Sequence, residues 1–503
     1  MLSKTRARLS NVLVAGSLFT FSVLFCPSLV VAASHFIPCL NDDEAPSGVY
    51  KISVPSPSEF RFSVDATIVI DGADLAMDTS RPGDVTEIGD KEWPEVIRNL
   101  KVTDENGREV AFIRNGDAGW KLTSPRKGGL HLTYTIDLTA LATANWPAPR
   151  EAAFGDSAHF IFVGRSTFIT SSSQRCSTVA FSLPTGWHAV APWRSSGQNS
   201  FSAATPRDLV ENLVVLTSEK TDVVKAGSFT VSVTPLGHWV NVRTDVATIL
   251  KGVIPRYVRL FGSKVPQQYS VVLLPVLDQG GEAYRASFAY TYEQAPTVAN
   301  EIDWGHIIAH EIFHYWNGYR LAGADYPSSQ WFQEGFTDYM ADISMRSAAL
   351  IDEKQFLSRL DSQLDRYSRL TTPLARPGTH KGPPLYGGGA LVALCWDIQI
   401  RSATHGKKSL LALWPLMWRR TNGGTKPYTW DDIRSSLNEI ASLDWDGFYK
   451  RYIDASEKLP LDEVLRTVGL TILPAKDGTR HVQIDLTAGA DAVKLRKQLL
   501  AGK

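Results

Sequence analysis

The chain has 503 residues, and its 52 Lys and Arg balance its 52 Asp and Glu, so the formal net charge is zero. This balance argues against a nucleic-acid-binding protein, which usually carries a basic patch or a high pI. The 14 Trp, 16 Tyr and 21 Phe exclude a disordered chain, and the length predicts about two to four domains of ordinary size.

Residues 1–33 have the pattern of an export signal. A positively charged start is followed by a largely apolar stretch that ends in Val31-Ala32-Ala33, whose small residues suit signal peptidase. We therefore expect a cleaved signal and an exported protein, periplasmic or extracellular. The alternative is an uncleaved N-terminal membrane anchor, because the apolar stretch approaches the ~20 residues that span a bilayer. No later segment is long and apolar enough to span a membrane.

Residues 34–240 are predicted to form an all-β N-terminal domain. Apolar and polar side chains alternate from Leu130 to Leu138, which is the period of a strand with one buried face. Similar short runs occur at residues 60–70, 160–163 and 229–233, and Gly, Pro, Asn and Asp separate them.

The cysteines agree with an oxidising compartment. Cys39 and Cys176 lie in polar, loop-like sequence and could pair there. Cys395 lies in an apolar run, where a free thiol behaves as a small hydrophobic residue.

Residues 241–458 are predicted to form a second domain that is mainly helical after residue 302. Apolar residues recur at helical spacing from Val242 to Val253, and residues 269–277 have the pattern of a strand. Later helices are indicated by an apolar face over residues 356–367 and by a capping box at Thr429. Residues 459–503 form a short C-terminal segment with a predicted strand at 481–486.

The segment His310-Glu311-Ile312-Phe313-His314 matches the pattern H-E-x-x-H. Two histidines four positions apart lie on one face of a helix, so both imidazoles can reach one metal ion. Glu311 lies beside them, where its carboxylate can accept a proton from a metal-bound water. The pattern alone also fits a helix with two hydrogen-bonded core histidines.

Glu334, twenty positions after His314, offers the third metal ligand. A His-His-Glu set leaves the fourth zinc position open, which is the arrangement of a catalytic rather than a structural site. Asp338 follows one helical turn later and could accept the second N–H of a zinc-bound histidine. It could equally be an ordinary solvated helix residue.

A zinc site with three histidines is excluded. It would need Gly at position 317 and His at position 320, where the chain has Asn317 and Arg320. His306, one turn before His310, would have to present a third successive turn to the same ion, so we interpret it as structural.

Together, His310 to Asn317 and the segment Trp331-Phe332-Gln333-Glu334-Gly335-Phe336-Thr337-Asp338-Tyr339 resemble the glycyl aminopeptidase family of gluzincin metallopeptidases, which are relatives of aminopeptidase N. The resemblance covers most of the mature chain. It implies a β-rich domain followed by an α+β, thermolysin-like catalytic domain, one Zn²⁺ per chain, and a peptide or protein substrate.

The resemblance also implies roles for two further segments. Tyr386 occupies the place of a tyrosine that donates its hydroxyl to the oxyanion of the tetrahedral intermediate, although Gly388 stands where relatives have a lysine. A plainer interpretation of the glycines at 387–389 is a flexible turn before a helix.

Gly280, Gly281 and Glu282 correspond to a substrate-binding edge strand, in which relatives use a glutamate to hold the substrate amine. Here Glu282 comes one position early and Ala283 stands in the expected place. Because a shift of one residue turns a strand side chain to the opposite face, either a bulge restores the direction of Glu282 or amine recognition is weakened.

The sequence therefore predicts an exported, aminopeptidase-like zinc metallopeptidase. His310, His314 and Glu334 bind zinc, Glu311 assists the attack of a zinc-bound water, and Tyr386 stabilises the oxyanion. A peptidase-like protein that binds peptides without turning them over is the main alternative. A further alternative is a zinc ion that has only a structural role.

Overall fold

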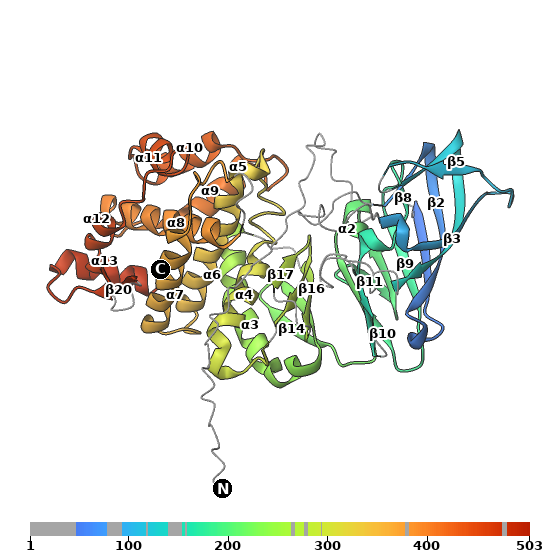
Figure 1. Ribbon diagram of the computed structural model, residues 1–503, viewed down its shortest axis with the longest axis horizontal. Coiled ribbons are helices and arrows are strands. Elements are labelled where there is room, and N and C mark those ends of the chain that lie inside the picture. The colour runs from blue at the N-terminus through green and yellow to red at the C-terminus, as the bar shows by residue number, and fades with distance from the viewer. Residues whose placement is uncertain are drawn as a thin grey trace, which may run out of the picture.

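The computed structural model describes residues 47–77, 93–116, 119–138, 153–155, 158–262, 267–275, 280–292, 294–377, 382–474 and 480–502. The predicted export signal and Cys39 lie outside these residues. A β-rich part is followed by a mainly helical part, with a smaller sheet between them (Figure 1). This order confirms the predicted fold class.

The largest sheet has nine strands, in the order β11-β12-β9-β1-β2-β5-β3, with β4 beside β5 and β8 beside β2. In β5, Leu130, Leu132, Tyr134 and Ile136 are buried, which confirms the predicted alternation. The strands of this sheet are β1 (Gly48–Ser53), β2 (Arg61–Ala76), β3 (Ile97–Asp104), β4 (Phe112–Arg114), β5 (Gly119–Asp137), β8 (Thr170–Ser171), β9 (Ser177–Ser182), β11 (Arg194–Gly197) and β12 (Ser200–Ala203).

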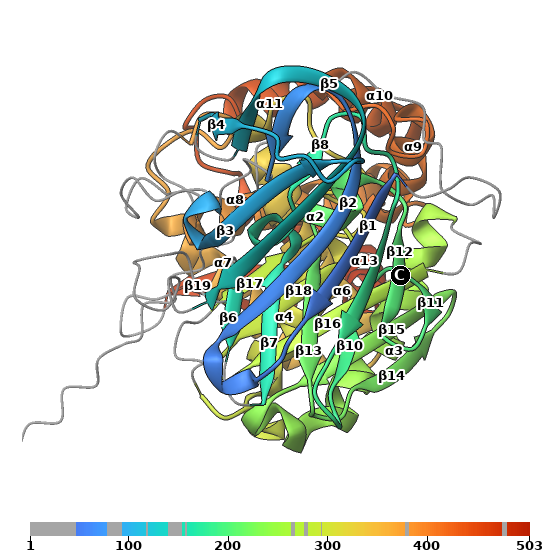
Figure 2. The same cartoon turned by 90° about the vertical axis from the view of Figure 1, so that its right-hand side faces the viewer.

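A four-stranded sheet, ordered β10-β13-β7-β6, packs against the first one. Its strands are β6 (Ala153–Gly155), β7 (His159–Val163), β10 (His188–Val190) and β13 (Leu213–Thr217). One face contributes Phe160 and Phe162 to the core of the β-rich part. The other face, with Ile161 and Val163, packs on Val272 of the next sheet, so β7 is buried on both sides. Figure 2 shows the strands of the β-rich part lying in front of the helical part.

The third sheet has five strands, in the order β14-β15-β16-β18-β17, and β17 lies at its edge. Its strands are β14 (Asp222–Ala226), β15 (Phe229–Pro235), β16 (Gln267–Leu274), β17 (Gly280–Ala283) and β18 (Ser287–Thr291). β14 and β15 precede residue 240, yet β15 pairs directly with β16. One face of the sheet packs on the helices, and the other packs on the four-stranded sheet.

The short helix α2 (Pro206–Val210) contributes Leu209 and Val210 to the core of the β-rich part. The later helices belong to the part of the chain that surrounds one large apolar core. They are α3 (Arg243–Phe261), α4 (Glu301–Phe313), α5 (Tyr326–Gln330), α6 (Phe336–Ser347), α7 (Glu353–Ser368), α8 (Pro383–Ala403), α9 (Leu413–Arg420), α10 (Trp430–Ile440), α11 (Trp445–Tyr452), α12 (Leu461–Arg466) and α13 (Ala490–Leu500), with the π-helical turn η7 (Trp331–Gly335). Single 3₁₀ turns are η1 (Pro57–Glu59), η3 (Trp93–Val96), η4 (Gly164–Ser166), η5 (Gly237–Val242), η6 (Val298–Asn300) and η8 (Leu410–Ala412). The predicted capping box at Thr429 is confirmed at the start of α10.

The C-terminal segment forms the hairpin β19 (Leu470–Pro474) and β20 (Arg480–Ile484), followed by α13. Asp361 of α7 accepts hydrogen bonds from the backbone N–H of Val482 (2.6 Å) and from His481 Nδ1 (2.9 Å). The hairpin is therefore tied to α7. Within the described ranges, no helix combines the length and the apolar character that crossing a membrane requires.

Two cysteines can be placed in the described part of the chain. Cys176 is disulfide-bonded, and Cys395 is a buried free thiol, as its apolar run predicts. Burial raises the pKa of the Cys395 thiol to about 12, so this cysteine is an unreactive core residue at neutral pH.

Candidate metal centre

Helix α4 carries His310, and the other predicted histidine ligand, His314, is the residue that caps the end of this helix. A capping box between Thr297 and Asn300 precedes the helix, and two acidic residues in its first turn complement its positive end. From Trp304 to the end of the helix every residue is buried. The histidines therefore lie in a medium of low dielectric, where charges interact strongly.

Glu334 lies in the π-helical turn η7, between α5 and α6. Such turns are rare and occur frequently at functional sites. Asn317, just after α4, donates its side-chain N–H groups to the carbonyl oxygens of Phe332 (3.2 Å) and Gln333 (3.0 Å). Asn317 thus ties the end of α4 to the turn that carries Glu334.

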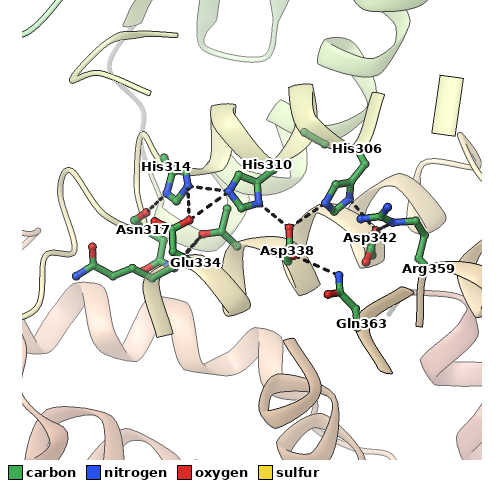
Figure 3. A network of polar contacts seen from close by, with 12 residues as sticks. His306, His310, His314, Asn317, Glu334, Asp338, Asp342, Arg359 and Gln363 are labelled. Atoms are coloured by element: carbon green, nitrogen blue, oxygen red, sulfur yellow. Dashed lines mark hydrogen bonds and ion pairs between the residues drawn. The ribbon is translucent and has the colours of Figure 1, made fainter. Parts of the chain in front are cut away.

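The structure brings His310, His314 and Glu334 together (Figure 3). The Nε2 atoms of the two histidines are 2.9 Å apart, and Glu334 Oε2 lies 3.5 Å from His310 Nε2 and 3.4 Å from His314 Nε2. All three side chains are buried. Neither oxygen of the Glu334 carboxylate has a hydrogen-bond partner among the described residues, which is costly for a buried charge unless a cation is bound.

The hydrogen bonds of the two Nδ1 atoms show which nitrogen of each histidine is available to a metal ion. His310 Nδ1 lies 2.8 Å from Asp338 Oδ1, and His314 Nδ1 lies 2.8 Å from the carbonyl oxygen of Asn317. Because both partners are acceptors, each Nδ1 carries a proton, and each Nε2 is therefore the nitrogen that can offer its lone pair to a metal ion. Two imidazole nitrogens and a carboxylate are the donor set of a zinc site with an open position, so these residues fit a zinc ion.

Without a metal, the close contacts between the histidines and the carboxylates shift the pKa values of His310 and Glu334. Burial alone would lower the pKa of His310, but the hydrogen bond to Asp338 and the contact with Glu334 raise it to about 10. Burial alone would raise the pKa of Glu334, but the charge of His314 and the contacts with both histidines lower it to about 2. The metal-free centre therefore holds a proton on His310 at neutral pH.

We expect zinc binding at pH 7 to release about one proton from the centre. His310 is protonated below its raised pKa of about 10, and a histidine must be neutral to bind a metal. Calorimetric titration in two buffers of different ionisation enthalpy measures this release, because the binding enthalpy then differs between the buffers. Identical enthalpies in both buffers would contradict the prediction.

Asp338 in α6 contacts His310 Nδ1, the ring nitrogen on the side away from Glu334. From the sequence, this contact was one of two possibilities for Asp338. Its other oxygen, Oδ2, accepts from Arg366 Nη1 (3.0 Å) and Gln363 Nε2 (3.2 Å) of α7. Burial opposes ionisation of this carboxyl, but hydrogen bonds with His306 and His310 hold its pKa well below its usual range. Asp338 therefore stays ionised and accepts the Nδ1–H of His310.

Glu311 is fully buried and lies against the edge strand β17. A Cβ atom built on Gly281 would lie 2.0 Å from Glu311 Oε1 and 2.5 Å from its Cδ. The backbone of β17 thus touches the Glu311 carboxylate, and position 281 has no room for a side chain while that carboxylate stays in place.

Glu282 lies on the other face of β17. The regular pairing of β17 with β18 puts Gly281 opposite Tyr290 and Glu282 opposite Ala289, and directly paired residues share a face. Tyr290 belongs to the core around the helices, whereas Ala289 faces the four-stranded sheet. The pairing of residues 280–283 contains no bulge, so Glu282 points away from the face that touches Glu311.

Tyr386 lies in α8, with its ring stacked on that of His310 at a centroid distance of 6.0 Å and an interplanar angle of 15°. The glycines at 387–389 lie inside α8, so the interpretation as a flexible turn is wrong. A Cβ atom on Gly389 would lie 2.0 Å from the carbonyl oxygen of Trp331, and one on Gly335 would lie 2.3 Å from Gly389 Cα. Gly389 and Gly335 let α8 touch η7, which brings Tyr386 to the side of His310.

Three contributions to the centre were not assigned from the sequence. Asn317 was recognised as part of a pattern, but its ties to η7 depend on folding. Gln363 and Arg366 of α7 hold Asp338 and belong to no motif. His306 was interpreted as structural, although its position one turn before His310 is the signal that it shares a helix face with the ligands.

Comparisons with known proteins show which family and which fold this chain resembles. Residues 304–378 match the family described as M61 glycyl aminopeptidase, and residues 49–215 match the Peptidase M61 N-terminal domain. An aminopeptidase N family protein from Idiomarina loihiensis is similar in structure, with a TM-score of 0.72 at 20% identity over 86% of this chain and 80% of that chain.

An M1 zinc metallopeptidase from Deinococcus radiodurans is also similar. Its mutant bound to a Tyr-Ser-Ala substrate has a TM-score of 0.53 at 18% identity over 82% of this chain and 94% of that chain. The structure described as the M1 zinc metallopeptidase itself has a TM-score of 0.52 at 17% identity over the same shares. These likenesses establish the fold. Among curated proteins the chain has no match.

Proposed function

The chain belongs to the glycyl aminopeptidase family of gluzincin metallopeptidases, and from this premise we propose that it is a zinc-dependent peptidase. The observation that carries the proposal is the convergence of His310, His314 and Glu334 in a buried group, with Glu311 next to His310 in the same helix. This arrangement provides metal ligands and a proton acceptor within one site.

His310 and His314 would hold one Zn²⁺ through their Nε2 atoms, and Glu334 would hold it through its carboxylate. When bound, zinc polarises a substrate carbonyl and lowers the pKa of water toward ~7. Asp338 and the carbonyl oxygen of Asn317 fix both imidazoles in the tautomer that this role requires.

Glu311 takes a proton from the attacking water and later delivers it to the leaving amine. The contact with Gly281 supports this role, because it restricts where the carboxylate can lie. Tyr386 donates its phenolic hydrogen bond to the oxyanion of the tetrahedral intermediate. Stacking on the His310 ring keeps the tyrosine beside the metal ligands.

Purified protein tested on a peptide mixture, with and without a chelator, decides between turnover and binding alone. We expect hydrolysis that the chelator abolishes and that added Zn²⁺ restores. Hydrolysis that is equal in all samples would overturn the proposal. Peptide binding without hydrolysis by zinc-loaded protein would support the alternative of a catalytically impaired peptide-binding protein, which the direction of Glu282 and the glycine at position 388 favour.

We expect Gly281→Ala to lower kcat/KM by roughly 10- to 100-fold while zinc affinity changes by less than about threefold. The added methyl group displaces the Glu311 carboxylate but lies on a strand that carries no metal ligand. Gly305→Ala in α4 is the matched control, because its methyl group would meet flexible side-chain atoms of Ile249, Met345 and Glu301 and no backbone atom among its nearest neighbours. Equal activity of the two variants would show that Gly281 does not constrain Glu311.

The proposed substrate is a peptide or protein, with aminopeptidase-like action. Because Glu282 faces away from Glu311, we expect Glu282→Gln to change kcat/KM for peptides with a free N-terminus by less than about threefold, since a charge that held the substrate amine would contribute more. Sequencing the products of a cleaved peptide library then separates the modes of action. Release of single N-terminal residues supports the aminopeptidase, and internal cuts establish an endopeptidase.

We also propose that the protein is exported and acts in the periplasm or outside the cell. The signal pattern of residues 1–33 motivates this, and the disulfide at Cys176 suits an oxidising compartment. N-terminal sequencing of the protein from cell fractions should find a chain that begins at Ser34 outside the cytoplasm. An intact N-terminus in the membrane fraction would indicate the uncleaved anchor.

A further inference from the structure

A chain of buried polar side chains continues beyond His310, away from the metal-binding group (Figure 3). His306 lies one helical turn before His310 in α4, and its Nε2 is 2.9 Å from Asp338 Oδ1. The same oxygen is 2.8 Å from His310 Nδ1. One carboxylate oxygen therefore contacts two imidazoles on the same helix face.

The far side of His306 is held as well. Its Nδ1 lies 2.8 Å from Asp342 Oδ1 in α6, and Arg359 Nε of α7 lies 2.9 Å from that same oxygen. His306 is 1% exposed and Asp342 is 2% exposed, so water does not compete for these contacts. The imidazole of His306 thus lies between two carboxylates of α6, with a hydrogen bond to Asp338 and a close contact, without hydrogen-bond geometry, to Asp342.

Opposing contacts act on Asp338. Arg366 and Gln363 of α7 contact its Oδ2, while His306 and His310 of α4 contact its Oδ1. If His306 were removed, the charged Arg366 would face a carboxylate held on the α4 side by His310 alone. Rotation of the carboxylate toward α7 would then weaken its hydrogen bond to His310.

We propose that His306 is a positioning residue for the metal centre, acting through the hydrogen bond from its Nε2 to Asp338 Oδ1. This inference rests on the proposed function, in which His310 is a metal ligand. His306 fixes the carboxylate that orients His310, and Asp342, which Arg359 holds, lies against the far side of His306. Loss of the group that accepts the second N–H of a ligating histidine typically costs 10- to 100-fold in metal affinity, and loss of His306 would act by displacing that group, Asp338.

The test compares His306→Gln with His306→Met in the purified full-length chain. Both side chains have nearly the same length and shape, but only glutamine carries an N–H group near the position of the histidine Nε2. The readout is the Zn²⁺ dissociation constant from competition with a chelator. Thermal unfolding of the metal-free proteins reports whether both variants fold.

We expect His306→Met to bind Zn²⁺ about 10- to 100-fold more weakly than the wild type and His306→Gln to stay within about threefold of it. Equal affinities of the two folded variants would overturn the inference, whether both are weak or both are strong. If His306→Met does not fold, His306→Asn replaces it, because its shorter amide reaches only toward Asp342. A wild-type chain that does not bind Zn²⁺ would instead contradict the proposed function.

Discussion

Glu311→Gln should bind Zn²⁺ as tightly as the wild type and hydrolyse peptides about 10³- to 10⁴-fold more slowly. The amide keeps the size of the side chain and its place against Gly281, but it cannot take a proton from water. General-base catalysis typically contributes about 10²- to 10⁴-fold, and Glu311 also has to return the proton to the leaving amine. The measurements are kcat/KM on a cleaved peptide and zinc content of the same preparation.

Glu301→Gln provides the control for this variant. Glu301 lies in the first turn of the same helix, so the substitution also exchanges a carboxylate for an amide in α4, at a distance of nearly three turns. We expect its activity to remain within about twofold of the wild type, since a charge at a helix start contributes only ~0.3–1 kcal/mol to stability. A Glu311→Gln enzyme that is as active as Glu301→Gln would remove Glu311 from the mechanism.

Gly389→Ala should lower the free energy of unfolding of the metal-free protein by about 3 kcal/mol. The part of the protein that still folds should have lost most of its peptidase activity. Its methyl group would lie 2.0 Å from the carbonyl oxygen of Trp331 and 2.9 Å from Gly335 Cα. Both contacts are with backbone, which cannot move aside cheaply, and overpacking of this kind typically costs ~1–3 kcal/mol or more. Relief of the clash requires α8 to move away from η7, which takes Tyr386 away from His310.

Gly388→Ala is the matched control, because it lies in the same helix and gains the same ~1 kcal/mol of helix propensity. Its methyl group would meet the side-chain ends of Leu374 at 2.6 Å and Tyr367 at 3.3 Å, which can rotate. We expect its free energy of unfolding to change by less than about 1 kcal/mol. Urea unfolding of both proteins measures the difference, and equal stabilities would show that the contact between α8 and η7 tolerates a methyl group.

The parts of the centre that depend on spacing along one helix were predictable. His310 and His314 lie four positions apart, and this spacing alone puts both on one helix face. The alternation in residues 130–138 likewise requires no tertiary information. Glu334 could be proposed as a ligand because it is a carboxylate within the segment 331–339. The π-helical turn that carries it could not be predicted from helix propensities.

The remaining features depend on how separate elements meet. The direction of Glu282 follows from the register of β17 against β18, and a displaced glutamate in the sequence is compatible with either face until that register is known. The role of Gly389 depends on the approach of α8 to η7. The link from His306 to Asp338 requires that α4 and α6 pack side by side, which no local pattern encodes.

The residues that complete the metal centre are far apart along the chain, so they meet only after a long segment has been synthesised. His310 contacts Asp338, 28 positions later, Gln363 reaches Asp338 from another 25 positions on, and Tyr386 stacks on His310 from a still later helix. Such long-range contacts form late, because their loop-closure entropy must be overcome first. If the exported chain crosses the membrane before it folds, it leaves the cytoplasm with these contacts unmade, and the peptidase stays inactive until it folds at its destination.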